Sequence, residues 1–217
     1  MSVATPPMRG LYLVTPDWDD SARLFSAVDA ALAGQPALLQ YRNKSTDAAR
    51  RLNEASRLAA LCRRAGVPFI VNDDLELALR VEADGVHLGR DDGALERARE
   101  RLGADRMLGV TCYNDVARAE AAEVLGADYV AFGAMFPSPS KPQAVVATPA
   151  VLSLARQRCA VPVAAIGGIT LENAAPLVAA GADLLAVISD VFMAADVAAR
   201  AAAYGALFDG ATPPARP

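Results

Sequence analysis

Two acidic clusters, each placed after a short apolar run, are the residues of this chain best suited to chemistry. The first is Asn72-Asp73-Asp74 and the second is Asp91-Asp92. If carboxylates lie on the same rim of adjacent parallel strands, they can hold Mg²⁺, which binds through one or two carboxylates, waters and substrate phosphates. We therefore predict that Asp73 and Asp92 hold Mg²⁺ in an enzyme that acts on phosphates. Each aspartate taken singly is also explained as a helix N-cap, so that interpretation stays open.

Basic residues suited to a diphosphate follow another apolar run, in the segment Gln40-Tyr41-Arg42-Asn43-Lys44. Arg42 and Lys44 alternate along it, so in an extended chain both side chains point the same way. We interpret the pair as a diphosphate clamp, with a solvated pair of surface charges as the alternative. Lys141 lies in Ser138-Pro139-Ser140-Lys141, where two hydroxyls and an ammonium can converge on one anion. A plain surface loop is the alternative there.

A third group of positions offers backbone amides. Gly167-Gly168 leaves N–H groups accessible to an anion, although a tight turn explains the pair equally well. Ile188-Ser189 begins a predicted helix, whose N-terminus favours negative charge. In a barrel of alternating strands and helices, the loops after strands seven and eight form a recurrent phosphate site, so we predict phosphate binding here. The single histidine, His87, is either a base or a hydrogen-bonded strand-end residue, and one histidine without a Cys/His cluster argues against zinc.

The elements that must position these residues alternate along the whole chain. Near-continuous apolar runs are typical of parallel strands buried on both faces, and stretches of helical composition separate them. The predicted strands are 11–15, 37–41, 68–71, 85–88, 107–111, 129–133, 161–166 and 184–188. The predicted helices are 46–65, 74–82, 93–102, 114–125, 148–158, 171–180 and an amphipathic segment over 194–206.

Eight such units without a break in composition predict a single-domain closed (β/α)8 TIM barrel over residues 11–210. An open doubly wound sheet is the alternative. We predict a flexible N-terminal tail over residues 1–10 and a disordered tail over 211–217, because both ends are rich in proline. The segment 134–147 is long for this fold, and long loops in compact domains are usually functional.

Composition limits the partners. The 217 residues are 53% hydrophobic and carry a net charge of −4, which suits one sizeable core and argues against nucleic acid, whose phosphates require a basic face. No apolar stretch approaches the ~20 residues that span a membrane, and residues 1–10 lack a signal-peptide core. Three scattered cysteines without a CxxC pair indicate reduced thiols in a cytoplasmic protein. The predicted partners are small molecules, and the oligomeric state, homo-oligomer included, stays open.

In this order, these residues resemble the thiamine-phosphate synthase family over nearly the whole barrel. The motifs that carry the resemblance are 40–44 (QYRNK), 72–73 (ND), 83–89 (ADGVHLG), 126–129 (GADY), 138–141 (SPSK) and 165–169 (AIGGI). The resemblance implies that hydroxymethylpyrimidine diphosphate loses pyrophosphate with the help of Mg²⁺. The nitrogen of thiazole phosphate then attacks the exposed methylene carbon and gives thiamine monophosphate. Such a reaction needs a metal, cations and a second ligand held in line, but no strong protein base.

The resemblance also implies residue roles. The pyrimidine diphosphate would be held by Gln40, Arg42, Lys44, Asn72 and Lys141, with Thr111 on the pyrimidine side. Mg²⁺ would be held by Asp73 and Asp92. The thiazole phosphate would be held by Ser138, Ser140, Gly168, Ile188 and Ser189. The neighbours Tyr41, Asn43 and Pro139 complete the predicted substrate-binding set, and the predicted catalytic residues are Lys141, Arg42 and Lys44.

The chain departs from the usual family residues at several positions. Asn43 and Asp91 stand where glutamate is common, and Arg90 stands where the family has glutamine. The family usually has threonine at Ser138 and Ser140, serine at Thr111, a small residue and histidine at Cys112-Tyr113, and a glycine shortly after Lys141. The missing glycine puts the flexibility of that loop in doubt.

Three other functions are weighed against this one. A thiazole tautomerase lacks the metal and diphosphate residues and uses a histidine base. A non-catalytic phosphate-binding barrel predicts the loss of Asp73, Asp92 or Lys141, all of which are present. A phosphosugar isomerase needs an acid/base pair at the barrel mouth, which the carboxylates here could supply.

Overall fold

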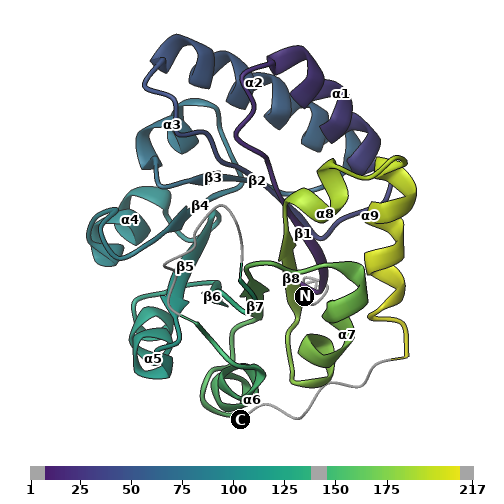
Figure 1. Ribbon diagram of the computed structural model, residues 1–217. Coiled ribbons are helices and arrows are strands. Elements are labelled where there is room, and N and C mark those ends of the chain that lie inside the picture. Colours follow the sequence, from purple (N-terminus) through teal and green to yellow (C-terminus); the bar gives the residue numbers. More distant parts are fainter. Residues whose placement is uncertain (1–7, 138–145, 211–217) are drawn as a thin grey trace, which may run out of the picture.

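The computed structural model describes residues 8–137 and 146–210 and shows eight parallel strands closed into one barrel (Figure 1). The strands pair in chain order, and the last pairs with the first. The predicted (β/α)8 fold is therefore confirmed. The strands are β1 (Gly10–Val14), β2 (Leu38–Tyr41), β3 (Phe69–Asn72), β4 (Gly85–Leu88), β5 (Met107–Tyr113), β6 (Tyr129–Phe132), β7 (Val163–Ile166) and β8 (Leu184–Val187).

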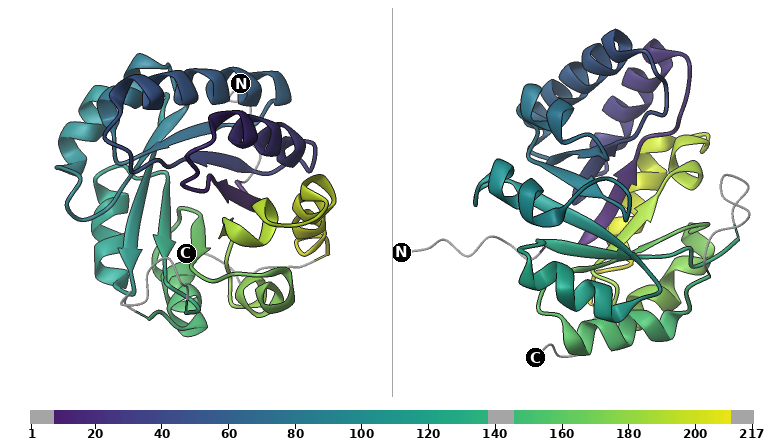
Figure 2. Two further views of the ribbon diagram at one scale, coloured as in Figure 1. Left: turned by 45° about the horizontal axis from the view of Figure 1, so that its top comes forward. Right: turned by 90° about the vertical axis from the view of Figure 1, so that its left-hand side faces the viewer.

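Helices follow the strands and surround them, as Figures 1 and 2 show. They are α1 (Ser21–Leu32), α2 (Ala48–Ala65), α3 (Leu75–Arg80), α4 (Leu95–Leu102), α5 (Val116–Val124), α6 (Pro149–Arg158), α7 (Leu171–Ala179), α8 (Ser189–Phe192) and α9 (Val197–Ala206). Each predicted helix range contains one of them. No range was predicted for α1 or α8: the start of α8 was predicted at Ser189, whereas α1 was missed, although Asp20 caps it by accepting a hydrogen bond from Arg23 N at 3.0 Å.

Smaller differences concern element ends. β5 continues past Thr111 to Tyr113, with a register shift between these two residues. α5 begins at Val116 and is capped by Asp115, two residues later than the predicted start at 114. No helix within residues 8–137 and 146–210 is long and apolar enough to cross a bilayer. The three cysteines are free thiols, all buried.

Side chains of the strands alternate between the barrel interior and the layer under the helices. The interior group consists of Tyr12, Val14, Leu38, Ile70, Tyr129, Ala131, Ala164, Leu184 and Ala186. Residues between these, such as Leu13 and Leu39, belong to the larger core that joins strands to helices. This alternation turns Gln40 into the interior, where it is 4% exposed, and turns its neighbour Tyr41 towards the helices.

Candidate functional site

A pocket of about 1030 Å³ lies at the carboxyl ends of the strands. Its lining comes from strands on all sides of the barrel and from the loops after β6, β7 and β8. Barrel enzymes carry their active sites at this end. The pocket brings together seven predicted site residues: Gln40, Arg42, Asn72, Thr111, Gly168, Ile188 and Ser189.

Asp73 and Asp92 follow β3 and β4 at the same end of the barrel, and neither caps a helix. Asp74 is the N-cap of α3, and its carboxylate accepts a backbone hydrogen bond at 2.9 Å. α4 begins after Ala94 without a side-chain cap, whereas Asp92 accepts a hydrogen bond from Gly89 N at 2.6 Å. The cap interpretation is therefore confirmed for Asp74 and wrong for Asp73 and Asp92.

The carboxyl groups of Asp73 and Asp92 contact each other. Loss of hydration, followed by the hydrogen bond and the charge of Asp92, raises the pKa of Asp73 to about 6, while Asn72 and Arg42 act in the opposite direction. Adjacent carboxylates repel unless a proton or a cation relieves them. The described part of the chain has no group of three or more His, Cys, Asp or Glu that could hold a metal. Two carboxylates still fit Mg²⁺, which takes its other ligands from water and substrate phosphates.

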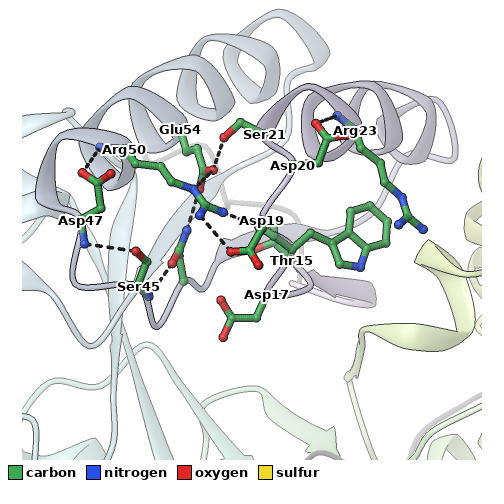
Figure 3. Close-up of polar contacts among 12 residues, drawn as sticks. Thr15, Asp17, Asp19, Asp20, Ser21, Arg23, Ser45, Asp47, Arg50 and Glu54 are labelled. Carbon is green, nitrogen blue, oxygen red and sulfur yellow. Dashed lines mark hydrogen bonds and ion pairs between the residues drawn. The ribbon is translucent and has the colours of Figure 1, made fainter.

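Glu54, on α2, is the centre of the contacts that hold the segment 40–44 (Figure 3). Its side chain is 0% exposed. It accepts hydrogen bonds from Ser21 Oγ at 2.5 Å, Tyr41 OH at 2.7 Å, Asn43 Nδ2 at 2.7 Å and Arg50 Nε at 2.9 Å. Burial alone would raise the pKa of Glu54, but these bonds outweigh burial and hold that pKa below its usual value.

This arrangement gives Tyr41 and Asn43 a structural role, and their place in the predicted substrate-binding set stays a prediction. The Tyr41 side chain is 2% exposed, and both side chains bond to Glu54. Neither residue lines the pocket. They hold the segment that carries Arg42 and Lys44.

The loop after β1, which carries Asp17 (Figure 3), also holds this segment, together with Thr15. Thr15 Oγ1 accepts a hydrogen bond from Arg42 N at 2.9 Å and donates to Arg42 O at 3.1 Å. Asp17 accepts a hydrogen bond from Lys44 N at 3.2 Å. The backbone of both predicted basic residues is thus held by side chains of another loop. Arg42 lines the pocket, while Lys44 is exposed and lies outside its lining.

Gly167 and Gly168 form a close contact with the loop after β6. Their φ angles are +105° and +61°, and a Cβ on Gly168 would lie 2.7 Å from Pro137 O. The Gly168 carbonyl accepts a hydrogen bond from Asn173 Nδ2 at 3.0 Å. The two glycines are therefore explained by a bend with positive φ and by this close approach. Such a bend is compatible with anion binding, because turns with such φ values gather backbone N–H groups into concave sites.

Asp190 and Arg200 join the loops after β7 and β8, and the sequence analysis did not predict either residue. Asp190 follows Ser189 and pairs with Arg200 at 2.8 Å. It also accepts a hydrogen bond from Leu171 N, at the start of α7, at 3.2 Å. Arg200 pairs with Glu172 at 2.8 Å and lines the pocket. These contacts fix the two predicted phosphate-binding positions relative to each other.

Ser138, Pro139, Ser140 and Lys141 lie outside the described residues, so their roles stay predictions. The site as described contains an arginine, an amide, a hydroxyl and backbone turns in one pocket, beside two paired carboxylates. An eight-stranded parallel barrel with such a site at the carboxyl ends defines a (β/α)8-barrel enzyme.

Comparison with known proteins identifies the family. The family model described as thiamine monophosphate synthase matches residues 11–191. The chain is 63% identical over 202 residues to thiamine-phosphate synthase of Aromatoleum aromaticum, which covers 93% of this chain and 97% of that protein. It is 62% identical over 201 residues to thiamine-phosphate synthase of Azoarcus sp., and the match covers 93% of this chain and 98% of that protein. The chain belongs to the thiamine-phosphate synthase family of transferases.

One solved structure supports this assignment, and a second supports the fold alone. Thiamine phosphate pyrophosphorylase from Pyrococcus furiosus matches with a TM-score of 0.82 at 32% identity, over 93% of this chain and 96% of that chain. A 3-hexulose-6-phosphate synthase matches with a TM-score of 0.66 at 18% identity, over 90% and 98%, and shares the fold alone.

Proposed function

We propose that the protein joins hydroxymethylpyrimidine diphosphate to thiazole phosphate and releases thiamine monophosphate and pyrophosphate. The observation that carries this proposal is that one pocket holds predicted residues of both substrate sites. Gln40, Arg42 and Asn72 line it from β2 and β3, and Gly168 and Ser189 line it from the loops after β7 and β8. Two ligands bound in one pocket react as if in a unimolecular step, because their orientation is already set.

In this proposal Arg42, Lys44, Asn72 and Lys141 bind the diphosphate, and Gln40 and Thr111 bind the pyrimidine ring. Asp73 and Asp92 hold Mg²⁺, whose positive charge would stabilise the departing pyrophosphate. The contact between these two carboxyl groups and the raised pKa of Asp73 support a cation here, since a cation would relieve their repulsion. Gly168, Ile188 and Ser189, with Ser138 and Ser140, bind the thiazole phosphate.

The proposed reaction requires no protein base, because the thiazole nitrogen attacks with its own lone pair. His87 agrees with this requirement. Burial lowers the pKa of His87 to about 4, and both ring nitrogens are within hydrogen-bonding distance of protein hydroxyls. A neutral imidazole whose two nitrogens are both hydrogen-bonded to the protein does not serve as a proton acceptor for substrate. We place the protein in the cytoplasm, because its free buried thiols suit a reducing compartment.

The test is to mix both substrates with Mg²⁺ and the full chain and to measure thiamine monophosphate and pyrophosphate. We expect the two products in equal amounts, and their loss in EDTA. Asp105→Ala removes an exposed carboxylate between α4 and β5, at the opposite end of the barrel. It is the control for removing the Asp73 carboxylate and should leave both products unchanged. Pyrophosphate without thiamine monophosphate would indicate a hydrolase, and no product from either substrate would refute the proposal.

A further inference from the structure

Five side chains form a continuous hydrogen-bonded chain through the barrel interior, here called the Gln40–Thr111 chain. Gln40 Nε2 donates to the Tyr12 hydroxyl at 2.5 Å, and that hydroxyl lies 2.6 Å from the Tyr129 hydroxyl. The Tyr129 hydroxyl lies 3.0 Å from His87 Nδ1, and His87 Nε2 lies 2.8 Å from Thr111 Oγ1. Four of the five residues, all except Tyr129, line the pocket, and the two ends, Gln40 and Thr111, belong to the predicted site. The three residues between them were not predicted to bind substrate.

The middle of the Gln40–Thr111 chain is buried and uncharged. Tyr12 is 1% exposed, Tyr129 0% and His87 6%. Burial raises the pKa values of both tyrosines well above their usual value and lowers that of His87. Buried neutral polar groups are almost always hydrogen-bonded, so each link of the chain must be made. Gly109 leaves the space for it, because a Cβ there would lie 2.6 Å from His87 Nδ1 and would overlap the Tyr129 ring.

Such a chain has a direction, because each hydroxyl has a single proton. Gln40 Nε2 donates to the Tyr12 hydroxyl, which keeps its own proton to donate, and Tyr129 is its other partner. If that proton goes to Tyr129, Tyr129 would donate to His87 Nδ1 and the proton of the neutral imidazole would be on Nε2. His87 Nε2–H would then donate to Thr111 Oγ1. The Thr111 hydroxyl proton and Gln40 Oε1 are then the groups that the chain offers to a ligand in the pocket.

We propose that Tyr12, Tyr129 and His87 are positioning residues that fix an acceptor at Gln40 and a donor at Thr111, and so select an amino-substituted heterocycle. The proposal rests on the proposed function for its ligand. An aminopyrimidine offers an amino donor and a ring-nitrogen acceptor, which match this order. The corresponding pyrimidinone offers a carbonyl acceptor and an N–H donor. To match its carbonyl at Gln40, the amide would have to turn over, which takes the Nε2 donor away from the buried Tyr12 hydroxyl.

The proton order can be measured directly, because His87 is the only histidine. In the full chain labelled with ¹⁵N-histidine and without substrate, we expect ¹H–¹⁵N correlations to show the neutral Nε2–H tautomer. Tyr129→Phe should shift the Nδ1 resonance, because Nδ1 loses its donor. Tyr204→Phe is the matched control, since it removes a hydroxyl bonded to Asp190 at 2.5 Å, outside the chain, and should leave the spectrum unchanged. An Nδ1–H tautomer or a charged ring in the unmodified protein overturns the proposal.

Selectivity gives the second measurement. With thiazole phosphate as the second substrate, kcat/KM is compared for hydroxymethylpyrimidine diphosphate and for its analogue with a carbonyl in place of the amino group. We expect Tyr12→Phe and Tyr129→Phe to reduce the preference for the amino substrate by about tenfold, while the KM for thiazole phosphate stays within about twofold. An unchanged preference in both variants, or an equal loss in Tyr204→Phe, overturns the proposal. If the unmodified protein makes no thiamine monophosphate, the proposed function fails, and the histidine spectrum still decides the proton order.

Discussion

Replacing Glu54 by glutamine tests how the segment carrying Arg42 and Lys44 is held in place. The Glu54 carboxylate is buried, and each of its oxygens accepts two hydrogen bonds. Ser21 and Arg50 donate to Oε1, while Tyr41 and Asn43 donate to Oε2. In glutamine one of these oxygens becomes an NH₂ group, which cannot accept.

In either orientation, the new NH₂ group faces a protein group that is itself a hydrogen-bond donor. On the Oε1 side the partner is Arg50 Nε, which can only donate. On the Oε2 side Asn43 would have to turn its amide, although its Oδ1 already accepts a hydrogen bond from Ser45 N at 2.7 Å. Glu54→Gln therefore leaves a buried donor unpaired and removes the charge opposite Arg50. Leaving a buried donor unpaired costs about 1–3 kcal/mol, against a domain stability of about 5–15 kcal/mol.

Urea unfolding measures this loss. We expect the free energy of unfolding to fall by about 1–3 kcal/mol, which corresponds to a fall in Tm of about 2–12 °C for a chain of this size. The KM for the pyrimidine diphosphate should rise, because the segment carrying Arg42 and Lys44 loses its anchor. Glu100→Gln, at an exposed position on α4, is the matched control and should stay within about 0.5 kcal/mol. A loss below about 1 kcal/mol in Glu54→Gln would refute this reasoning.

The pH dependence of the free energy of unfolding tests the same prediction a second way. The folded-state pKa of Glu54 lies below its usual value, which is about 4.3 in an unfolded chain. The stabilisation linked to that shift is fully present above the unfolded-state pKa and is lost as the pH falls through the folded-state pKa. The difference in stability between the unmodified protein and Glu54→Gln should therefore be largest near neutral pH and should shrink below about pH 4. A constant difference down to about pH 3 would contradict the assignment of the shift to this carboxylate.

Three further substitutions test other parts of the site. Asp73→Ala should sharply lower kcat and abolish its dependence on Mg²⁺, so activity that is unaffected by EDTA in the unmodified protein would refute the metal role. Ser189→Ala should mainly raise the KM for thiazole phosphate, and an effect confined to the pyrimidine substrate would reverse the assignment of the two sites. Gly168→Ala should lower the free energy of unfolding by about 1–3 kcal/mol, because φ is +61° and the new Cβ would meet Pro137 O. Gly205→Ala in α9, where a Cβ meets nothing within 4 Å, is its control and should not destabilise the protein.

The eight strands were predictable because parallel strands buried on both faces must be almost continuously apolar. Their order around the barrel followed from the alternation with helices. The sequence analysis missed α1, although its buried residues Leu24, Phe25, Val28, Ala31 and Leu32 recur at helical spacing. Its N-cap, Asp20, was a second signal in the sequence. Both observations were available without a structure.

The site was predictable only where residues follow strand ends. Such positions converge at one end of a barrel, which explains why Arg42, Asn72 and Ser189 share a pocket. Tyr12 and Tyr129 lie deeper, and their inward direction follows from strand alternation, but their hydrogen bond depends on two strands far apart in sequence. Glu54 lies on the buried face of α2. A buried charged residue must have a hydrogen-bonding or ionic partner, but the sequence pattern does not identify which residue that is.

The distribution of charge in this site suits the proposed reaction. Loss of pyrophosphate leaves an anion and an electron-poor methylene carbon. The charged groups Arg42, Asp73 and Asp92 follow the ends of β2, β3 and β4, where the leaving group would lie. The pocket floor contains the uncharged Gln40–Thr111 chain, in which both nitrogens of His87 are already engaged. Among the five residues of this chain no ring nitrogen is free to trap the carbon, so in the proposed reaction the thiazole nitrogen would be the nucleophile.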